Sequence, residues 1–216
     1  MTDFIVRHEA PLRLLFFLGI FAAVAYSETV SPRRLLTTSK SGRWFANIGI
    51  VVLNSVALRL VFPVAAMGMA VYAGERGWGL LNNVPVPYWF AVVISVLALD
   101  FVIYLQHVMF HAVPTLWRLH MMHHADLDFD VTTGSRFHPV EILLSMVIKM
   151  AAVAALGPPA LGVFLFEVLL NGTAMFNHGN LKLPTELDRW LRLFVVTPDM
   201  HRVHHSVFPF EANSNF

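Results

Sequence analysis

Residues 87–113 read PYWFAVVISVLALDFVIYLQHVMFHAV, an apolar run that carries two histidines near its end. A membrane span needs about 20 apolar residues at a rise of about 1.5 Å per residue, so this stretch can cross a bilayer as a helix. With about 3.6 residues per turn, Asp100, Tyr104, His107 and His111 lie along one stripe of that helix. The stretch therefore predicts a membrane helix that presents an acid, a phenol and two imidazoles on one face.

Three further apolar stretches flank this run, at residues 11–26, 44–73 and 140–176. Arg59 and Pro63 interrupt the second stretch, and Arg59 either marks a helix break or pairs with an acid inside the bundle. Gly157-Pro158-Pro159 divides the last stretch into two short halves, which predicts a tight helical hairpin. The chain of 216 residues is 56% hydrophobic and 13% charged, against about 25% charged in soluble domains. The expected fold class is all-α, a polytopic integral membrane helical bundle with about four membrane stretches.

The length fits a single membrane domain, residues 1–216. Within it, residues 1–99 supply N-terminal membrane helices. Residues 100–216 contain ten of the eleven histidines, in the boxes described below, and are expected to form the catalytic region. Residues 1–26 fit either a retained first helix or a signal peptide. We expect a retained helix, because the rest of the chain is also rich in membrane-like segments.

Basic residues predict the orientation of the helices. The loop after the first stretch carries Arg33, Arg34, Lys40 and Arg43, whereas the next loop carries only Arg76. Cytoplasmic loops are enriched in Lys and Arg, so the first loop and every histidine motif are expected on the cytoplasmic side. A net charge of +1 gives no footprint for nucleic acid, and the absence of cysteine excludes disulfides, iron–sulfur clusters and thiolate ligands.

Histidine is concentrated in the second half of the chain, where ten of the eleven lie between His107 and His205. The pair His107-x3-His111 can reach one ion from a single helix face, since residues four apart are neighbours there. Two boxes of the form His-x2-His-His follow, at residues 120–124 and 201–205. Adjacent histidines diverge by about 100° on a helix, so each box can serve two ions. The pattern predicts a centre of two metal ions and makes scattered structural histidines the weaker explanation.

Other polar residues have less specific interpretations. His138 and His178 flank the last stretch and are expected to join the ligands, whereas isolated His8 is not. Asp100, Tyr104 and Asp199 are candidates to orient ligand rings from behind, and no catalytic residue is expected beyond the metal centre itself. The alternating Asp126, Asp128 and Asp130 indicate a solvated acidic loop, the alternative being contact with the metal centre or an electron donor.

Four segments in this order resemble the fatty acid hydroxylase / sterol desaturase superfamily. They are Asp100-x3-Tyr104-x2-His107-x3-His111, Leu116-Trp117-Arg118-x-His120-x2-His123-His124, Arg136-x-His138-Pro139 and His201-Arg202-x-His204-His205-Ser206. The sequence departs from this family at Gln106-His107-Val108, where many members have arginine after the histidine. It also ends at residues 213–216, where relatives usually continue, so a truncated chain is one interpretation.

The resemblance implies a membrane fold with a cytosolic helical cap and a non-haem di-metal centre. It also implies O₂-dependent hydroxylation or desaturation of a lipid C–H bond. The implied metal ligands are His107, His111, His120, His123, His124, His201, His204 and His205, joined by His138 and His178. The expected cofactors are two iron ions with O₂ as co-substrate, and zinc can replace iron in purified protein because it generally binds such sites more tightly.

The expected partners are a lipid from the bilayer and an external electron donor (a ferredoxin, cytochrome or reductase), and no nucleic acid. Two other functions remain open from the residues alone. A zinc-dependent membrane hydrolase would ordinarily carry His-Glu-x-x-His, which is absent. A non-enzymatic membrane metal-binding or transport protein would call for polar residues along several helices, whereas here the candidate ligands gather on one side. The sequence does not identify the lipid.

Overall fold

The computed structural model describes residues 2–216, and its regular structure is helical throughout that range. Five segments are long and apolar enough to span a membrane. They comprise α2 (Glu9–Val30), α3 (Lys40–Val61) continued by α4 (Ala66–Arg76), α5 (Tyr88–Ala112), α7 (Pro139–Leu156) and α8 (Ala160–Asn177). This confirms the predicted polytopic all-α membrane fold. The shorter helices are α1 (Thr2–Arg7), η1 (Leu80–Asn82), α6 (Pro114–His124), η2 (Thr133–Ser135), α9 (Thr185–Leu191), α10 (Pro198–His204) and α11 (Pro209–Ala212).

Proline and glycine set several of the helix boundaries. The second apolar stretch breaks after Val61, because Pro63 has no backbone N–H and cannot continue α3. Arg59 lies exposed on α3, and the described part of the chain offers it no ion pair, so the helix break is the interpretation that stands. Gly157 ends α7 in the left-handed region with φ of 66°, which glycine adopts without strain. The helical hairpin predicted for residues 140–176 is therefore confirmed as α7 and α8.

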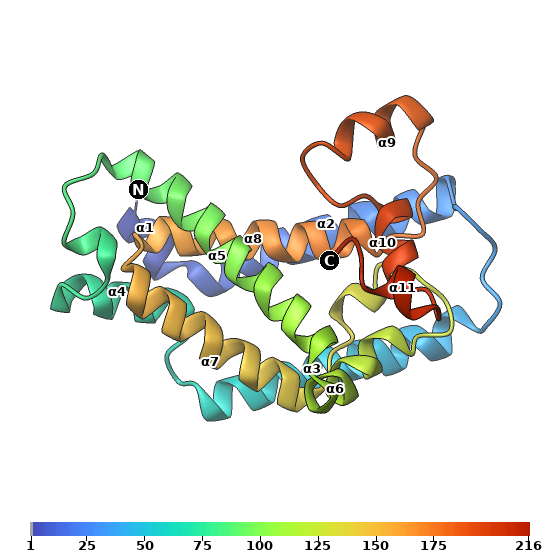
Figure 1. Cartoon of the computed structure of the whole chain (residues 1–216), viewed down its shortest axis with the longest axis horizontal. Helices are drawn as coiled ribbons and strands as arrows, with labels where there is room; N and C mark the ends of the chain where they lie inside the picture. Colours follow the sequence, from blue (N-terminus) through green and yellow to red (C-terminus); the bar gives the residue numbers. More distant parts are fainter. Residues whose placement is uncertain (1) are drawn as a thin grey trace.

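Helix α8 lies at the centre of the packing, against α2, α4, α5 and α10. Small and branched side chains such as Ala70, Val153 and Val163 form a buried core with Leu99 and Phe166. Large apolar side chains elsewhere on α2, α3 and α5 are exposed, as expected for surfaces that face lipid. The short helices α6, α10 and α11 gather toward one end of the long helices (Figure 1). That end receives the C-termini of α5 and α8, which carry histidines.

Candidate metal centre

Four segments bring the histidines together at this end of the molecule. Helix α5 contributes two from its last turns, α6 contributes three, His178 follows α8 as its C-cap residue, and α10 with its C-cap residue contributes three. Proline at the first turn of α6 and α10 fixes where each of these short helices begins. The i,i+3 and i,i+4 spacings of the sequence thereby become two converging clusters of rings.

Nine histidines form two groups in which the possible ligand nitrogens all lie within 4.8 Å of one another. The first histidine group consists of His107, His111, His120, His124 and His204. The second histidine group consists of His123, His178, His201 and His205. Each His-x2-His-His box supplies both groups, so adjacent histidines belong to different groups, as their helical geometry predicts.

The spacing of the nitrogens fits shared metal ions. In the first group, Nε2 of His107 lies 3.1 Å from Nε2 of both His120 and His204. In the second group, Nε2 of His178 lies 3.0 Å from Nε2 of His123 and His201 and 3.1 Å from that of His205. Two nitrogens bound at right angles to one ion, each about 2.1 Å from it, are about 3 Å apart. The donor sets therefore have the spacing that metal ligands require.

Unpaired nitrogens give a second test of this fit. Nε2 of His111 and both ring nitrogens of His124 are buried, and no group among residues 2–216 hydrogen-bonds to them. Leaving such atoms without a partner costs about 1–3 kcal/mol each, so native proteins rarely tolerate them. A metal ion in the first group would pair with Nε2 of His111 and with one nitrogen of His124, and so the residues fit such an ion.

Hydrogen bonds on the opposite side of five rings orient their Nε2 atoms. Four of these bonds go to backbone carbonyls. Nδ1 of His123 lies 3.2 Å from the carbonyl of Arg136, and Nδ1 of His178 lies 2.7 Å from that of Ala174. Nδ1 of His201 lies 3.1 Å from the carbonyl of Asn215, and Nδ1 of His204 lies 2.8 Å from that of Ser214. Nδ1 of His120 lies 2.6 Å from Oε1 of Glu141. Each Nδ1 donates its hydrogen to these acceptors, so the lone pair of Nε2 is free for a metal.

Burial keeps the rings outside the membrane segments neutral. It lowers the pKa of His178 to about 3 and that of His204 to about 2. Burial also lowers the pKa of His123, His201 and His205, and neighbouring imidazoles lower each of them further. Neutral imidazole is the form that binds metal, so these rings need not lose a proton to act as ligands at neutral pH.

His138 lies outside both histidine groups. It is the N-cap residue of α7, and its Nδ1 accepts a hydrogen bond from the backbone N–H of Val140 at 3.2 Å. His8, which the sequence sets aside, contacts the carbonyl of Phe4 instead. The structure thus brings nine of the ten candidate ligands together and gives His138 the role of a helix cap.

The three polar residues expected to orient ligand rings lie elsewhere. Asp100 and Tyr104 line the cavity described below, and no hydrogen bond within the described range joins either to a histidine. Asp199 pairs with Arg33 at 2.8 Å. The carboxylate that does contact a ligand ring is Glu141, which is 4% exposed and which the sequence reasoning missed. Its only sequence signal is an acid at the start of an apolar helix, three residues after His138.

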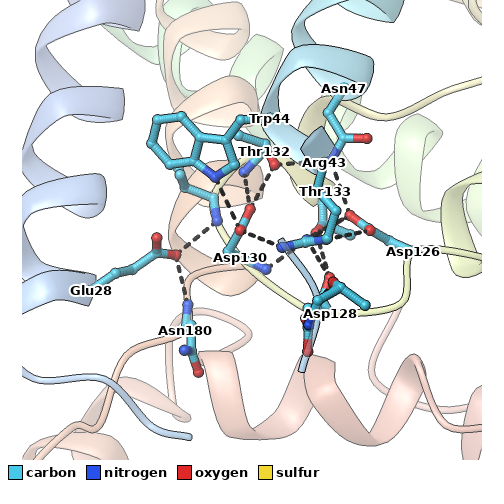
Figure 2. A network of polar contacts seen from close by, with 12 residues as sticks. Glu28, Arg43, Trp44, Asn47, Asp126, Asp128, Asp130, Thr132, Thr133 and Asn180 are labelled. Carbon is cyan, nitrogen blue, oxygen red and sulfur yellow. Dashed lines mark hydrogen bonds and ion pairs between the residues drawn. The ribbon is translucent and has the colours of Figure 1, made fainter. Parts of the chain in front are cut away.

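The acidic loop, residues 125–132, is packed and not solvated, so that expectation is wrong. Asp128 and Asp130 are buried, and Arg43 of α3 pairs with Asp126 at 2.8 Å and with Asp130 at 2.7 Å (Figure 2). Burial raises the pKa of Asp128, but hydrogen bonds from Thr38 and Thr37 outweigh it and lower the pKa to about 2. The pKa of Asp126 is lowered as well, so Asp126 and Asp128 remain ionised inside the protein because α3 and the segment before it supply donors.

This polar network extends to the second histidine group. Asn47, fully buried on α3, donates to Asp126 at 3.0 Å and accepts from Nη1 of Arg136 at 2.8 Å (Figure 2 shows Asn47 and Asp126). Nε of Arg136 donates to the carbonyl of Met122 at 2.9 Å, and the Arg136 carbonyl accepts from His123. Helix α3 thus holds α6 and the orientation of one ligand ring through two side chains.

A cavity of about 730 Å³ opens beside the histidines and runs between α5, α7 and α8. His107, His120, His123, His178 and His201 form part of its wall. Much of the remaining wall is apolar, including Phe101, Ile103, Ile142, Leu170 and Phe216. A volume of this size accommodates a drug-sized or larger apolar ligand, and it places that ligand directly against both histidine groups.

Comparisons with known proteins agree with this geometry. A family model described as "Fatty acid hydroxylase" matches residues 92–216, more than half of the chain. The ornithine lipid hydroxylase OlsE of Rhizobium tropici is 27% identical over 227 residues, covering 100% of this chain and 67% of the relative. The alkylglycerol monooxygenase of Xenopus tropicalis is 24% identical over 79% of this chain and 37% of the relative. Methylsterol monooxygenase 2-2 of Arabidopsis thaliana is 28% identical over 63% of this chain and 53% of the relative. No solved structure matches the chain significantly.

Proposed function

We propose that this chain, which belongs to the fatty acid hydroxylase family, is a membrane-bound oxygenase that hydroxylates a C–H bond of a lipid with two iron ions and O₂. The observation that carries the proposal is the pair of histidine groups, buried or half-buried and with converging Nε2 atoms, on the wall of a largely apolar cavity. The names of the three relatives favour hydroxylation over desaturation, since each is a hydroxylase or monooxygenase.

The proposed ligands are the nine histidines of the two groups, without His138. Bound iron supplies the redox chemistry that reduces O₂ and oxidises an unactivated C–H bond, with electrons from an external donor. Glu141 and four backbone carbonyls hold the Nδ1 protons and so keep the Nε2 atoms turned toward the metals. The apolar part of the cavity wall excludes water and holds the lipid chain against the histidines.

We propose that the histidine groups lie on the cytoplasmic side of the membrane, where a soluble electron donor can reach them. The segment between α2 and α3 carries Arg33 and Arg34, and Lys40 begins α3, all at the histidine end of the molecule. Enrichment of Lys and Arg on that side supports a cytoplasmic location. Single-cysteine variants in this segment, tested in oriented cells with a membrane-impermeant thiol reagent, report the side directly, because the chain has no cysteine of its own.

Metal analysis of histidine variants tests the ligand assignment. Protein loaded anaerobically with Fe²⁺ is expected to bind two ions. The variants His124→Ala and His204→Ala are each expected to bind the ion of the first histidine group more weakly. His138→Ala is the matched control and is expected to retain both ions, since its ring caps α7. Two tightly bound ions in both His124→Ala and His204→Ala would contradict the assignment.

Oxygen consumption separates an oxygenase from a metal-dependent hydrolase. Under reducing conditions with membrane lipid present, the iron-loaded chain is expected to consume O₂ and to yield a lipid heavier by one oxygen atom. Zinc-loaded protein is the control and is expected to consume none. A single zinc ion as the active form, with no O₂ consumption by the iron-loaded chain, would refute the proposal.

A further inference from the structure

Apart from the histidines, the cavity wall has a charged region, the polar end, formed by Arg13 of α2 and Lys149 of α7. Both cations reach Glu167 of α8, at 2.9 Å from Arg13 and 3.1 Å from Lys149. The side chain of Glu167 is 1% exposed. Charged side chains within membrane segments are costly and usually mark a functional site. This cluster is separate from the histidine groups and has no part in holding metal.

The cations of the polar end face the cavity while their acidic partners lie behind them. Arg13 and Lys149 line the cavity, whereas Glu167 and Glu9, the second partner of Arg13, do not. Nη1 of Arg13 donates to Glu9 and is also the atom of Arg13 closest to Glu167. Its Nε and Nη2 atoms make no hydrogen bond to another residue in the described structure, and its side chain is 33% exposed. The polar end therefore presents spare N–H donors to whatever occupies the cavity.

The distance from the polar end to the histidines is set by α7. Glu141, which contacts His120, and Lys149 lie eight residues apart on this helix. At a rise of about 1.5 Å per residue this is about 12 Å. An extended alkyl chain with C–C bonds of about 1.5 Å covers this length in roughly ten bonds. A purely hydrocarbon chain end would leave the spare donors unpaired and desolvated, which is unfavourable.

We propose that the polar end binds a carbonyl oxygen of the lipid, from an ester, an amide or a carboxylate, through Arg13 and Lys149. This rests on the proposed function and specifies its substrate. The hydrocarbon chain then runs along the cavity and places a carbon roughly ten bonds from the carbonyl beside the histidines.

A photoreactive probe tests the orientation of the bound chain. The probe is dodecanoic acid with a diazirine at its terminal carbon, added to the metal-loaded full chain in lipid nanodiscs, and labelled residues are located by mass spectrometry. We expect labels near the histidines, at Tyr104 or Phe216, because the carbonyl is held at Lys149. Labels concentrated around Lys149 would place the chain in the opposite direction and overturn the proposal. The methyl ester of the probe shows which carbonyl group is bound. Labelling by both the acid and the ester would indicate that an uncharged carbonyl is sufficient, and labelling by the acid alone would indicate that a carboxylate is required.

Two variants test the role of the cation. Lys149→Met is expected to lower this labelling about tenfold, the effect of one charged hydrogen bond, and Lys149→Arg to retain most of it. Arg59→Met is the matched control, because Arg59 is a membrane-segment cation that does not line the cavity. Equal labelling of Lys149→Met and the unmodified chain would show that the ion cluster only ties helices together. Metal content and lipid oxidation are measured on each sample. A Lys149→Met chain that binds iron, oxidises lipid and is labelled as strongly as the unmodified chain would refute the carbonyl site and leave the proposed function intact. The position of the label in the unmodified chain remains decisive if Lys149→Met does not fold.

Discussion

Replacing Glu141 by leucine should weaken one metal site and spare the other. Oε1 of Glu141 lies 2.6 Å from Nδ1 of His120, and both side chains are almost fully buried, 5% and 3% exposed. Leucine removes the acceptor while keeping the helix start apolar, so His120 loses the contact that fixes its ring. His120 belongs to the first histidine group only, whereas three of the four rings of the second group are held by backbone carbonyls.

The expected magnitude follows from the type of contact. Loss of a hydrogen-bond partner behind a ligand ring typically weakens metal binding about 10–100-fold, which corresponds to about 1.4–2.7 kcal/mol. Titration of apo protein with Fe²⁺ or Co²⁺, followed by absorption spectroscopy, should give one unchanged affinity and one reduced by this factor. Glu141→Gln retains an acceptor oxygen and should lose less.

Glu186→Leu on exposed α9 is the control for a general effect of removing a glutamate, and both affinities should remain unchanged. Loss of both sites to the same extent in Glu141→Leu would indicate a general folding defect. Two unchanged affinities would refute the role of Glu141 in orienting His120.

Three further predictions concern the surrounding structure. Asn47→Leu removes the hydrogen bonds to Asp126, Thr132 and Arg136, at about 1 kcal/mol each. It should lower the free energy of unfolding by about 2–4 kcal/mol, measured by denaturant titration in detergent with Glu186→Leu on exposed α9 as the control. Because the pKa of Asp128 is lowered to about 2 in the folded chain, its stabilisation is present above about pH 4 and is lost as the pH falls toward 2. The difference in melting temperature between the unmodified chain and Asp128→Asn should therefore shrink over that interval, and a constant difference would contradict the burial of an ionised Asp128. Gly157→Val forces a β-branched residue to a φ of 66° and should lower the melting temperature by several degrees. Gly19→Val lies on an open face of α2 and should leave the melting temperature nearly unchanged, because valine has no lower helix propensity than glycine.

The membrane helices could be predicted because their signals are local in the sequence. The run at residues 87–113, Pro63 in the second stretch and Gly157 in the last each act within a few residues of where they stand. Helical spacing also predicted that the boxes would share their histidines between two sites. The division of the nine rings into a group of five and a group of four depends on how α6 and α10 face each other, and sequence spacing does not contain that information.

The errors at the site have physical causes of the same kind. A histidine before proline at a helix start is equally consistent with a ligand and with a cap, and His138 is a cap. The acidic loop looks solvated in the sequence because its cationic partner, Arg43, lies 83 residues before Asp126. Glu141 was missed because its partner, His120, is on another helix. Contacts between distant residues leave no periodic signal, so such partners become visible only in the folded chain.

The number of iron ions bound per chain tests the central claim most directly. Apo protein reconstituted anaerobically with Fe²⁺ should bind two ions per chain, and X-ray absorption at the iron edge should show a first coordination shell dominated by imidazole nitrogen. Double substitution of His178 and His205 by alanine should leave a single ion, held by the first histidine group. Saturation at one ion in the unmodified chain, or a coordination shell without histidine nitrogen, would contradict the account.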